Sequence, residues 1–139
     1  MRKLSKGHEI ANTLTHLFGI ILFAAFLPSL FSKMVEEKNV AYLWTIIVFS
    51  FGLFMAYGAS TIYHHIKNEN LKRILRIWDH TAIYFLIGGT YTPLIAKYLP
   101  YDKAFWFLII MWSIITLGVI LKIFYTGKYE LLSVFSYLF

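Results

Sequence analysis

Long stretches without a charged side chain are the feature that most constrains this sequence. No Asp, Glu, Lys or Arg occurs in residues 10–32, 40–66, 82–96 or 104–121. A helix needs about 20 mostly apolar residues to cross the roughly 30 Å hydrocarbon core of a bilayer. The first two runs exceed that length, and the other two approach or reach it when their rims are counted. With 59% hydrophobic and 14% charged residues, the chain is predicted to be a membrane protein and not a water-soluble one.

The predicted fold is all-α, a polytopic transmembrane helix bundle in which residues 1–139 form a single membrane domain. We expect four complete spans, over residues 12–32, 40–65, 78–98 and 104–125. The last apolar segment, residues 130–139, is too short to cross a bilayer as a helix. It is expected either to lie in the interface or to be a partial fifth span.

Basic residues are unevenly distributed between the predicted loops. Of the 13 Lys and Arg, nine fall in the N-terminal tail, the second loop and the segment after the fourth span. These nine are Arg2, Lys3, Lys6, Lys67, Lys72, Arg73, Arg76, Lys122 and Lys128. Since positively charged loops stay in the cytoplasm, the N-terminus is predicted to be cytoplasmic. The net charge of +6 is therefore attributed to basic residues that hold loops in the cytoplasm. Membrane lipids are expected partners of the protein, and nucleic acid is not.

The first predicted span carries a stripe of polar and small residues. Glu9, Asn12, His16 and Gly19 follow one another at steps of three and four, so they share one helical face. Such a stripe is expected to face the bundle and not the lipid. The alternative is that Asn12 or Thr15 caps the helix and that His16 lies in the headgroup layer.

The second predicted span carries a row of small residues. Gly52, Ala56 and Ser60 recur at every fourth position, and His64 continues the row. Small residues at this spacing allow two helices in a membrane to approach closely. We therefore expect the row to face another helix and His64 to point inward, while His65 is expected to be exposed at the interface.

The third predicted span is preceded by a basic and apolar segment. Residues 67–77 are expected to form an amphipathic turn of helix at the interface, where basic residues attract anionic headgroups. The alternative is that these basic residues only keep the loop in the cytoplasm, as positively charged loops generally do. The span itself opens with Asp79 and His80, and Pro93 near its end lacks an N–H for the helical ladder.

Because successive spans cross in opposite directions, His16, His64 and Asp79 are all predicted to lie in the inner leaflet. Zinc accepts imidazole and carboxylate ligands, and a catalytic zinc ion has three protein ligands and a water. Asp79 is then a candidate to orient or deprotonate that water, and Ser60 to polarise a substrate or support the ligands. A structural hydrogen bond or a proton relay remains an alternative for the same residues.

Taken together, these segments resemble the hemolysin III family, the bacterial branch of the PAQR group of adiponectin and progestin receptors. The motifs that carry the resemblance are Glu9-x-x-Asn12-x-x-Thr15-His16, Ser60-x-x-x-His64, and Asp79-His80 followed by residues 87–93. They occur in the family's order, and the resemblance covers essentially the whole sequence. It implies a seven-helix bundle with a cytoplasmic N-terminus, in a bacterial cytoplasmic membrane.

The resemblance also implies a metal site. In the receptors a zinc ion is held by a histidine of helix two and two histidines of helix seven, with an aspartate of helix three near its water. His64 matches the helix-two ligand, Asp79 matches the aspartate, and Ser60 matches the family's helix-two serine. The sequence ends in the expected helix five, so the helix-seven ligands are absent from it. We expect these residues to be the N-terminal part of the bundle, with an incomplete zinc site.

Three functions are compatible with this resemblance. The first is a zinc-dependent hydrolase of an amide or ester of a membrane lipid. The second is a cytolytic pore, as the family's name implies, and the third is a receptor-like or structural membrane protein. Expected partners are membrane lipids, with a homo-oligomer or missing C-terminal helices completing the bundle. The sequence assigns no role to His16, His65 or His80.

Overall fold

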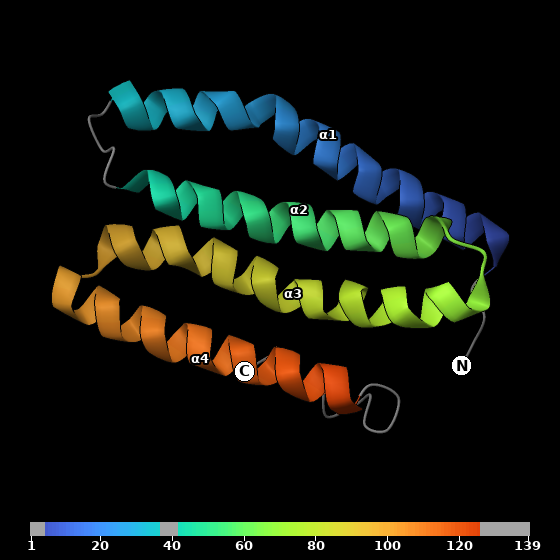
Figure 1. Cartoon of the computed structure of the whole chain (residues 1–139). Coiled ribbons are helices and arrows are strands. Elements are labelled where there is room, and N and C mark those ends of the chain that lie inside the picture. Colours follow the sequence, from blue (N-terminus) through green and yellow to red (C-terminus); the bar gives the residue numbers. More distant parts are fainter. Residues whose placement is uncertain (1–4, 37–41, 126–139) are drawn as a thin grey trace.

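A computed structural model describes residues 5–36 and 42–125 of the protein. This part of the chain is helical throughout apart from short links (Figure 1). Its four helices are α1 (Lys6–Glu36), α2 (Leu43–His65), α3 (Glu69–Tyr98) and α4 (Tyr101–Tyr125). The predicted partial span at residues 130–139 lies outside the described residues.

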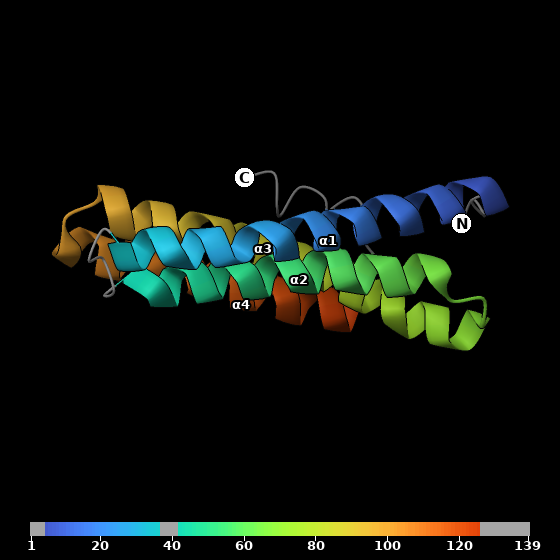
Figure 2. The same ribbon diagram turned by 90° about the horizontal axis from the view of Figure 1, so that it is seen from above.

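The four helices lie side by side in chain order, each antiparallel to the one before it (Figure 1). Contacts are made between α1 and α2, α2 and α3, and α3 and α4. Seen from above, the axes of the helices run in nearly the same direction (Figure 2). The links are short: residues 66–68 join α2 to α3, and residues 99–100 join α3 to α4. Short connections of this kind favour antiparallel neighbours.

The start of α3 precedes the predicted span. Residues 67–77 were expected to form an amphipathic turn of helix at the interface before a span beginning at residue 78, and one continuous helix runs from Glu69 to Tyr98 through both parts. The Asn68 side chain caps this helix by accepting hydrogen bonds from the backbone N–H groups of Asn70 and Leu71, at 3.0 and 3.1 Å. No proline or glycine follows until Gly88, so nothing interrupts the helix between the loop and the span.

Two glycines allow α2 and α3 to meet backbone to backbone. A Cβ atom on Gly52 would collide with the carbonyl oxygen of Phe85, and one on Gly89 would lie 3.0 Å from the carbonyl oxygen of Val48. Gly52 and Ser60 are buried. The small-residue row of the second span therefore faces another helix, as expected, and at Gly52 that helix is α3; at the end of the row His64 contacts α1.

The contact between α3 and α4 includes a polar link. The indole Nε1 of Trp112 donates a hydrogen bond of 3.2 Å to the hydroxyl of Thr92, which in turn donates to the backbone oxygen of Gly88 at 2.6 Å. Thr92 is fully buried. In a membrane interior such a bond stabilises the pairing of two helices, although by a modest amount.

Trp112→Phe is expected to lower the free energy of unfolding by about 1 kcal/mol, because it removes this hydrogen bond and leaves most of the aromatic packing in place. The measurement is thermal unfolding of the protein in detergent. Trp106→Phe is the matched control, since Trp106 is 64% exposed on the same helix. Equal melting temperatures for the two variants would contradict the expectation.

The outer surface of the helices is apolar, as expected for a protein in lipid. Large side chains such as Phe26, Ile114 and Phe124 are more than 60% exposed. Within the described residues, α1, α2 and α4 are long and apolar enough to span a membrane. These findings support an integral helical membrane protein. The crossing of α3, which packs between two such helices, remains a prediction because polar residues in it lower its hydropathy, and so does the cytoplasmic N-terminus.

Candidate functional site

The polar side chains of the bundle meet where α1 begins, α2 ends and α3 begins. Glu9 of α1 lies at the centre of this cluster. One of its carboxylate oxygens, Oε2, is 2.6 Å from Nδ1 of His64, and the other, Oε1, is 2.7 Å from Nζ of Lys72. These side chains are only 10 to 21% exposed. A single carboxylate therefore joins three helices.

Glu9 fixes the orientation of the His64 ring. Because a carboxylate accepts hydrogen bonds, Nδ1 is the nitrogen that carries a proton toward Glu9. The other nitrogen, Nε2, then presents its lone pair on the far side of the ring. Its contact there is with the side-chain amide of Asn12, at 3.4 Å, which is a long distance for a hydrogen bond. The His64 ring is therefore held by a short contact at Nδ1 and by only a long contact at Nε2.

Aromatic rings surround this imidazole. His16 stacks on His64 with ring centroids 6.1 Å apart and nearly parallel planes, and Tyr57 meets His16 edge to face at 5.6 Å. Tyr63 packs against His64 at 4.8 Å and also lies beneath the ammonium of Lys72. The stripe of the first span therefore faces the bundle, as expected. The capping alternative is wrong, because α1 begins at Lys6, well before Asn12 and Thr15.

The remaining predicted site residues lie at the same end. Ser60 is buried on α2, one turn before His64. Asp79 is on α3, with its side chain 18% exposed, and its carboxylate lies 3.7 Å from Nδ1 of His80. His65 is exposed, as expected.

His80 makes its described polar contacts with its own helix. Its Nδ1 lies 2.8 Å from the backbone oxygen of Arg76, one turn earlier in α3. The described contacts of His80 are thus with α3 itself, through Arg76 and Asp79. No contact between His80 and His64 is found among the described residues, so His80 does not join His64 in the cluster.

The described residues do not by themselves form a zinc site. Within residues 5–36 and 42–125, no three His, Asp or Glu side chains are arranged to hold one metal ion. His64 alone fits a ligand position well, because a metal-binding histidine almost always donates its second ring N–H to a carboxylate or carbonyl. The Glu9 contact supplies that partner. The donor set as described is one imidazole with its supporting carboxylate.

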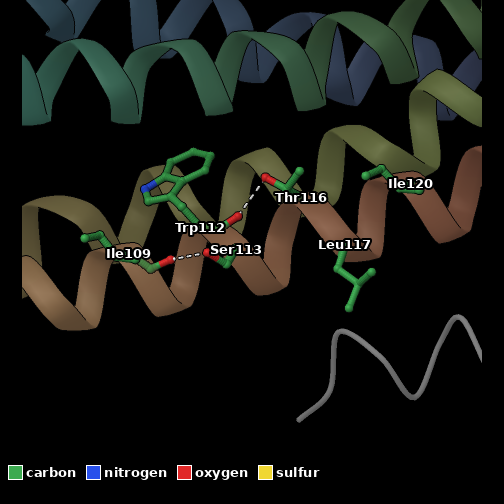
Figure 3. Close-up of a pocket in the computed structure, with 6 residues that line it drawn as sticks. All are labelled: Ile109, Trp112, Ser113, Thr116, Leu117 and Ile120. Carbon is green, nitrogen blue, oxygen red and sulfur yellow. Dashed lines mark hydrogen bonds between the residues drawn. The ribbon is translucent and has the colours of Figure 1, made fainter.

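A shallow apolar groove on α4 is a weaker candidate. Its lining comes from one helix and includes Ile109, Trp112, Ser113, Thr116, Leu117 and Ile120 (Figure 3). The hydroxyls of Ser113 and Thr116 donate to backbone oxygens one turn earlier in the same helix. Since the polar groups are already paired and no titratable side chain lines the groove, it offers little chemistry.

Sequence reasoning missed two residues of the cluster as site residues. Glu9 was placed on the inward stripe without a partner, and Lys72 was assigned to the interfacial loop. Their contacts join positions 55 and 63 residues apart in the chain. Two signals in the sequence pointed to Glu9: it lies on the same helical face as His16, and it belongs to the motif that carries the family resemblance.

Comparison with known proteins places the chain among relatives. A family model described as "Haemolysin-III related" matches residues 4–139. The chain belongs to the hemolysin III family. No solved structure is significantly similar to it.

Two members of the hemolysin III family illustrate the relationship. The hemolysin-3 homologue of Bacillus subtilis (strain 168) is 38% identical over 133 residues, which are 94% of this chain and 61% of the relative. The hemolysin-3 of Bacillus cereus is 32% identical over 130 residues, covering 94% of this chain and 59% of the relative. The chain thus spans about three fifths of the length of these hemolysin III relatives.

Proposed function

We propose that this member of the hemolysin III family contributes one metal ligand, His64, and its supporting residues to a zinc-dependent hydrolase of membrane-lipid amides or esters. The observation that carries the proposal is the 2.6 Å contact between Nδ1 of His64 and the carboxylate of Glu9. It holds the ring so that Nε2 is available to a cation, the arrangement found around histidine ligands.

The other ligands are proposed to come from outside the described residues. The resemblance to the zinc-containing receptors implies two histidines of a seventh helix, and the curated relatives are longer than this chain. A bound zinc ion would supply the Lewis acid for cleavage of an amide or ester. Residues of this chain hold His64 in place and shape the surroundings of the metal.

Ser60 and Asp79 are proposed as the catalytic residues on this side of the site. Ser60 is buried one turn from His64 on α2, and its hydroxyl is a group that is able to donate to a substrate carbonyl. Asp79 lies in the first half of α3, the half that follows the link from α2, and its carboxylate is suited to accept a proton during hydrolysis. Asp79→Asn and Ser60→Ala are expected to lower turnover while zinc stays bound.

The proposal is tested on the protein isolated from its native membrane, after its intact mass has been compared with the 16.3 kDa of these 139 residues. The purified protein is treated with a chelator and then supplied with zinc, and hydrolysis of fatty-amide and ester lipids is measured. Activity that is lost on chelation and restored by zinc supports the proposal. Hydrolysis that persists without metal would refute a metal-dependent mechanism, and an absence of hydrolysis with zinc bound would refute the enzyme.

Glu9→Gln is expected to weaken zinc binding by about 10- to 100-fold, the usual cost of removing the partner of a histidine ligand. The measurement is a competition titration against a chromophoric chelator. Glu36→Gln, at the exposed end of the same helix, is the control and leaves the affinity unchanged. Affinities of the two variants within twofold of each other would remove Glu9 from the metal's surroundings.

A cytolytic pore is the competing function, favoured by the name of the Bacillus cereus relative. A water-filled path needs polar side chains along several spans, whereas the clustered ionisable groups described above gather at one end of the bundle. Dye release from liposomes distinguishes the two functions. Release that persists in a His64→Ala, Asp79→Asn double variant would favour the pore, and the hydrolase predicts that any lysis is lost with the zinc.

A further inference from the structure

The first turns of α3 present an exposed surface that the proposed hydrolase does not use. Leu71, Ile74 and Trp78 are 43, 56 and 53% exposed. Their spacing of three and four residues places them on one stripe of the helix. Lys72, between them in sequence, reaches across to Glu9 of α1, which fixes the rotation of the helix. The stripe is therefore an outward face.

Two basic side chains accompany this stripe. Arg73 is exposed next to Ile74, and Lys67 is exposed in the link that precedes the cap of α3. Neither forms an ion pair or hydrogen bond within the described part of the chain. Two carboxylates lie near these basic groups in the chain or the fold. That of Glu9 is shared by Lys72 and His64, and that of Glu69, in the first turn of α3, leaves the pair of basic groups with one excess positive charge. The charge offered to the surroundings by Lys67 and Arg73 is therefore positive.

The predicted crossing of the membrane by α3 places these residues at the membrane surface. Its 30 residues extend over about 45 Å, which exceeds the roughly 30 Å of hydrocarbon that a span must cross. The charged first turns cannot enter the hydrocarbon, so they lie at the level of the headgroups. Trp78 then lies near the boundary of the two regions, where tryptophan is enriched in membrane proteins.

We propose that Lys67 and Arg73 bind the phosphate of an anionic phospholipid of the bilayer, whose acyl chains lie along Ile74 and Trp78. The basic groups are complementary in charge to the headgroup, and a long Arg side chain reaches it while its stem covers apolar surface. The exposed stripe ends at Trp78, because Thr81 and Ala82, the next positions on the same face, are buried, so the contact with the acyl chains is limited to Ile74 and Trp78. The site is independent of any metal, because Lys67 and Arg73 make no contact with His64.

The test uses the full-length protein in detergent, with phosphatidylglycerol and phosphatidylcholine as probes and native mass spectrometry to count retained lipids. Each basic residue near a membrane surface contributes a factor of about five in affinity. Lys67→Gln with Arg73→Gln is therefore expected to reduce the preference for phosphatidylglycerol by about 25-fold. Lys97→Gln with Lys103→Gln, exposed at the other end of the bundle, is the matched control and keeps the preference.

Two results would overturn the proposal. One is an unchanged preference in the Lys67, Arg73 variant, and the other is an equal loss in the control, which would indicate general attraction between charges. A second measurement examines the acyl chains. Brominated phosphatidylglycerol is expected to quench tryptophan fluorescence less in Trp78→Phe than in Trp106→Phe. Equal quenching in the two would place the acyl chains elsewhere.

Discussion

His64→Ala in the full-length protein is expected to reduce bound zinc to the background level, whereas His65→Ala is expected to retain the wild-type stoichiometry. The two histidines are adjacent at the end of α2, but they differ in environment. His64 is held by Glu9 and stacked on His16, while His65 is exposed. Only His64 is proposed to direct a ring nitrogen at the metal.

The expected loss of zinc affinity in His64→Ala is large because this substitution removes the proposed ligand itself, whereas Glu9→Gln removes only the residue that supports it. Loss of a supporting partner costs about 10- to 100-fold in affinity, so loss of the ligand is expected to exceed roughly 100-fold. Zinc is measured by inductively coupled plasma mass spectrometry on protein of known concentration. Circular dichroism of both variants shows that the helices persist. Full zinc occupancy in a folded His64→Ala protein would exclude the proposed ligand and with it the metal-dependent function.

Gly52→Ala is expected to produce the largest loss of stability, although it adds a single methyl group. The new Cβ would collide with the backbone oxygen of Phe85 on α3. A backbone atom cannot rotate away as a side chain does, so the two helices must separate. We expect the free energy of unfolding to fall by about 3 kcal/mol, at the upper end of the range for overpacked sites.

Gly58→Ala is the matched control for Gly52→Ala. It lies on the same helix, and a Cβ there would meet no atom within 4 Å. Alanine favours helix over glycine by about 1 kcal/mol, so Gly58→Ala is expected to be neutral or stabilising. Thermal unfolding in the same detergent compares the two. Melting temperatures that agree within about 2 °C would show that α2 and α3 are not in backbone contact.

The sequence predicted the parts of the fold that depend on periodicity. Regular spacing of small residues identified the face of α2 that meets another helix, and the stripe from Glu9 to Gly19 identified the inward face of α1. Both follow from the 3.6-residue repeat of a helix, which is local information. The ends of the helices were less predictable. The thickness of the bilayer sets the length of a membrane span, but a helix extends beyond the span until a capping residue such as Asn68 ends it.

The candidate site was predictable only in part. His64, Ser60 and Asp79 were singled out by their positions near helix ends, and the structure places them at one end of the bundle. Which side chains touch was not predictable. The pairing of Glu9 with both His64 and Lys72 depends on the rotation of three helices relative to one another, and no short-range pattern in the sequence records that rotation. The metal-binding role itself remains a prediction.

The shared carboxylate of Glu9 has a consequence for the order of events during biosynthesis. Lys72 is made 63 residues after Glu9, which corresponds to roughly 3 to 13 s at about 5–20 residues per second. Through that interval a charged side chain at the start of α1 has no counterion from α3, so it stays hydrated at the membrane surface. The contact of Glu9 with His64 needs only the first two helices, whereas full pairing of its carboxylate is expected only once the start of the third helix has been made.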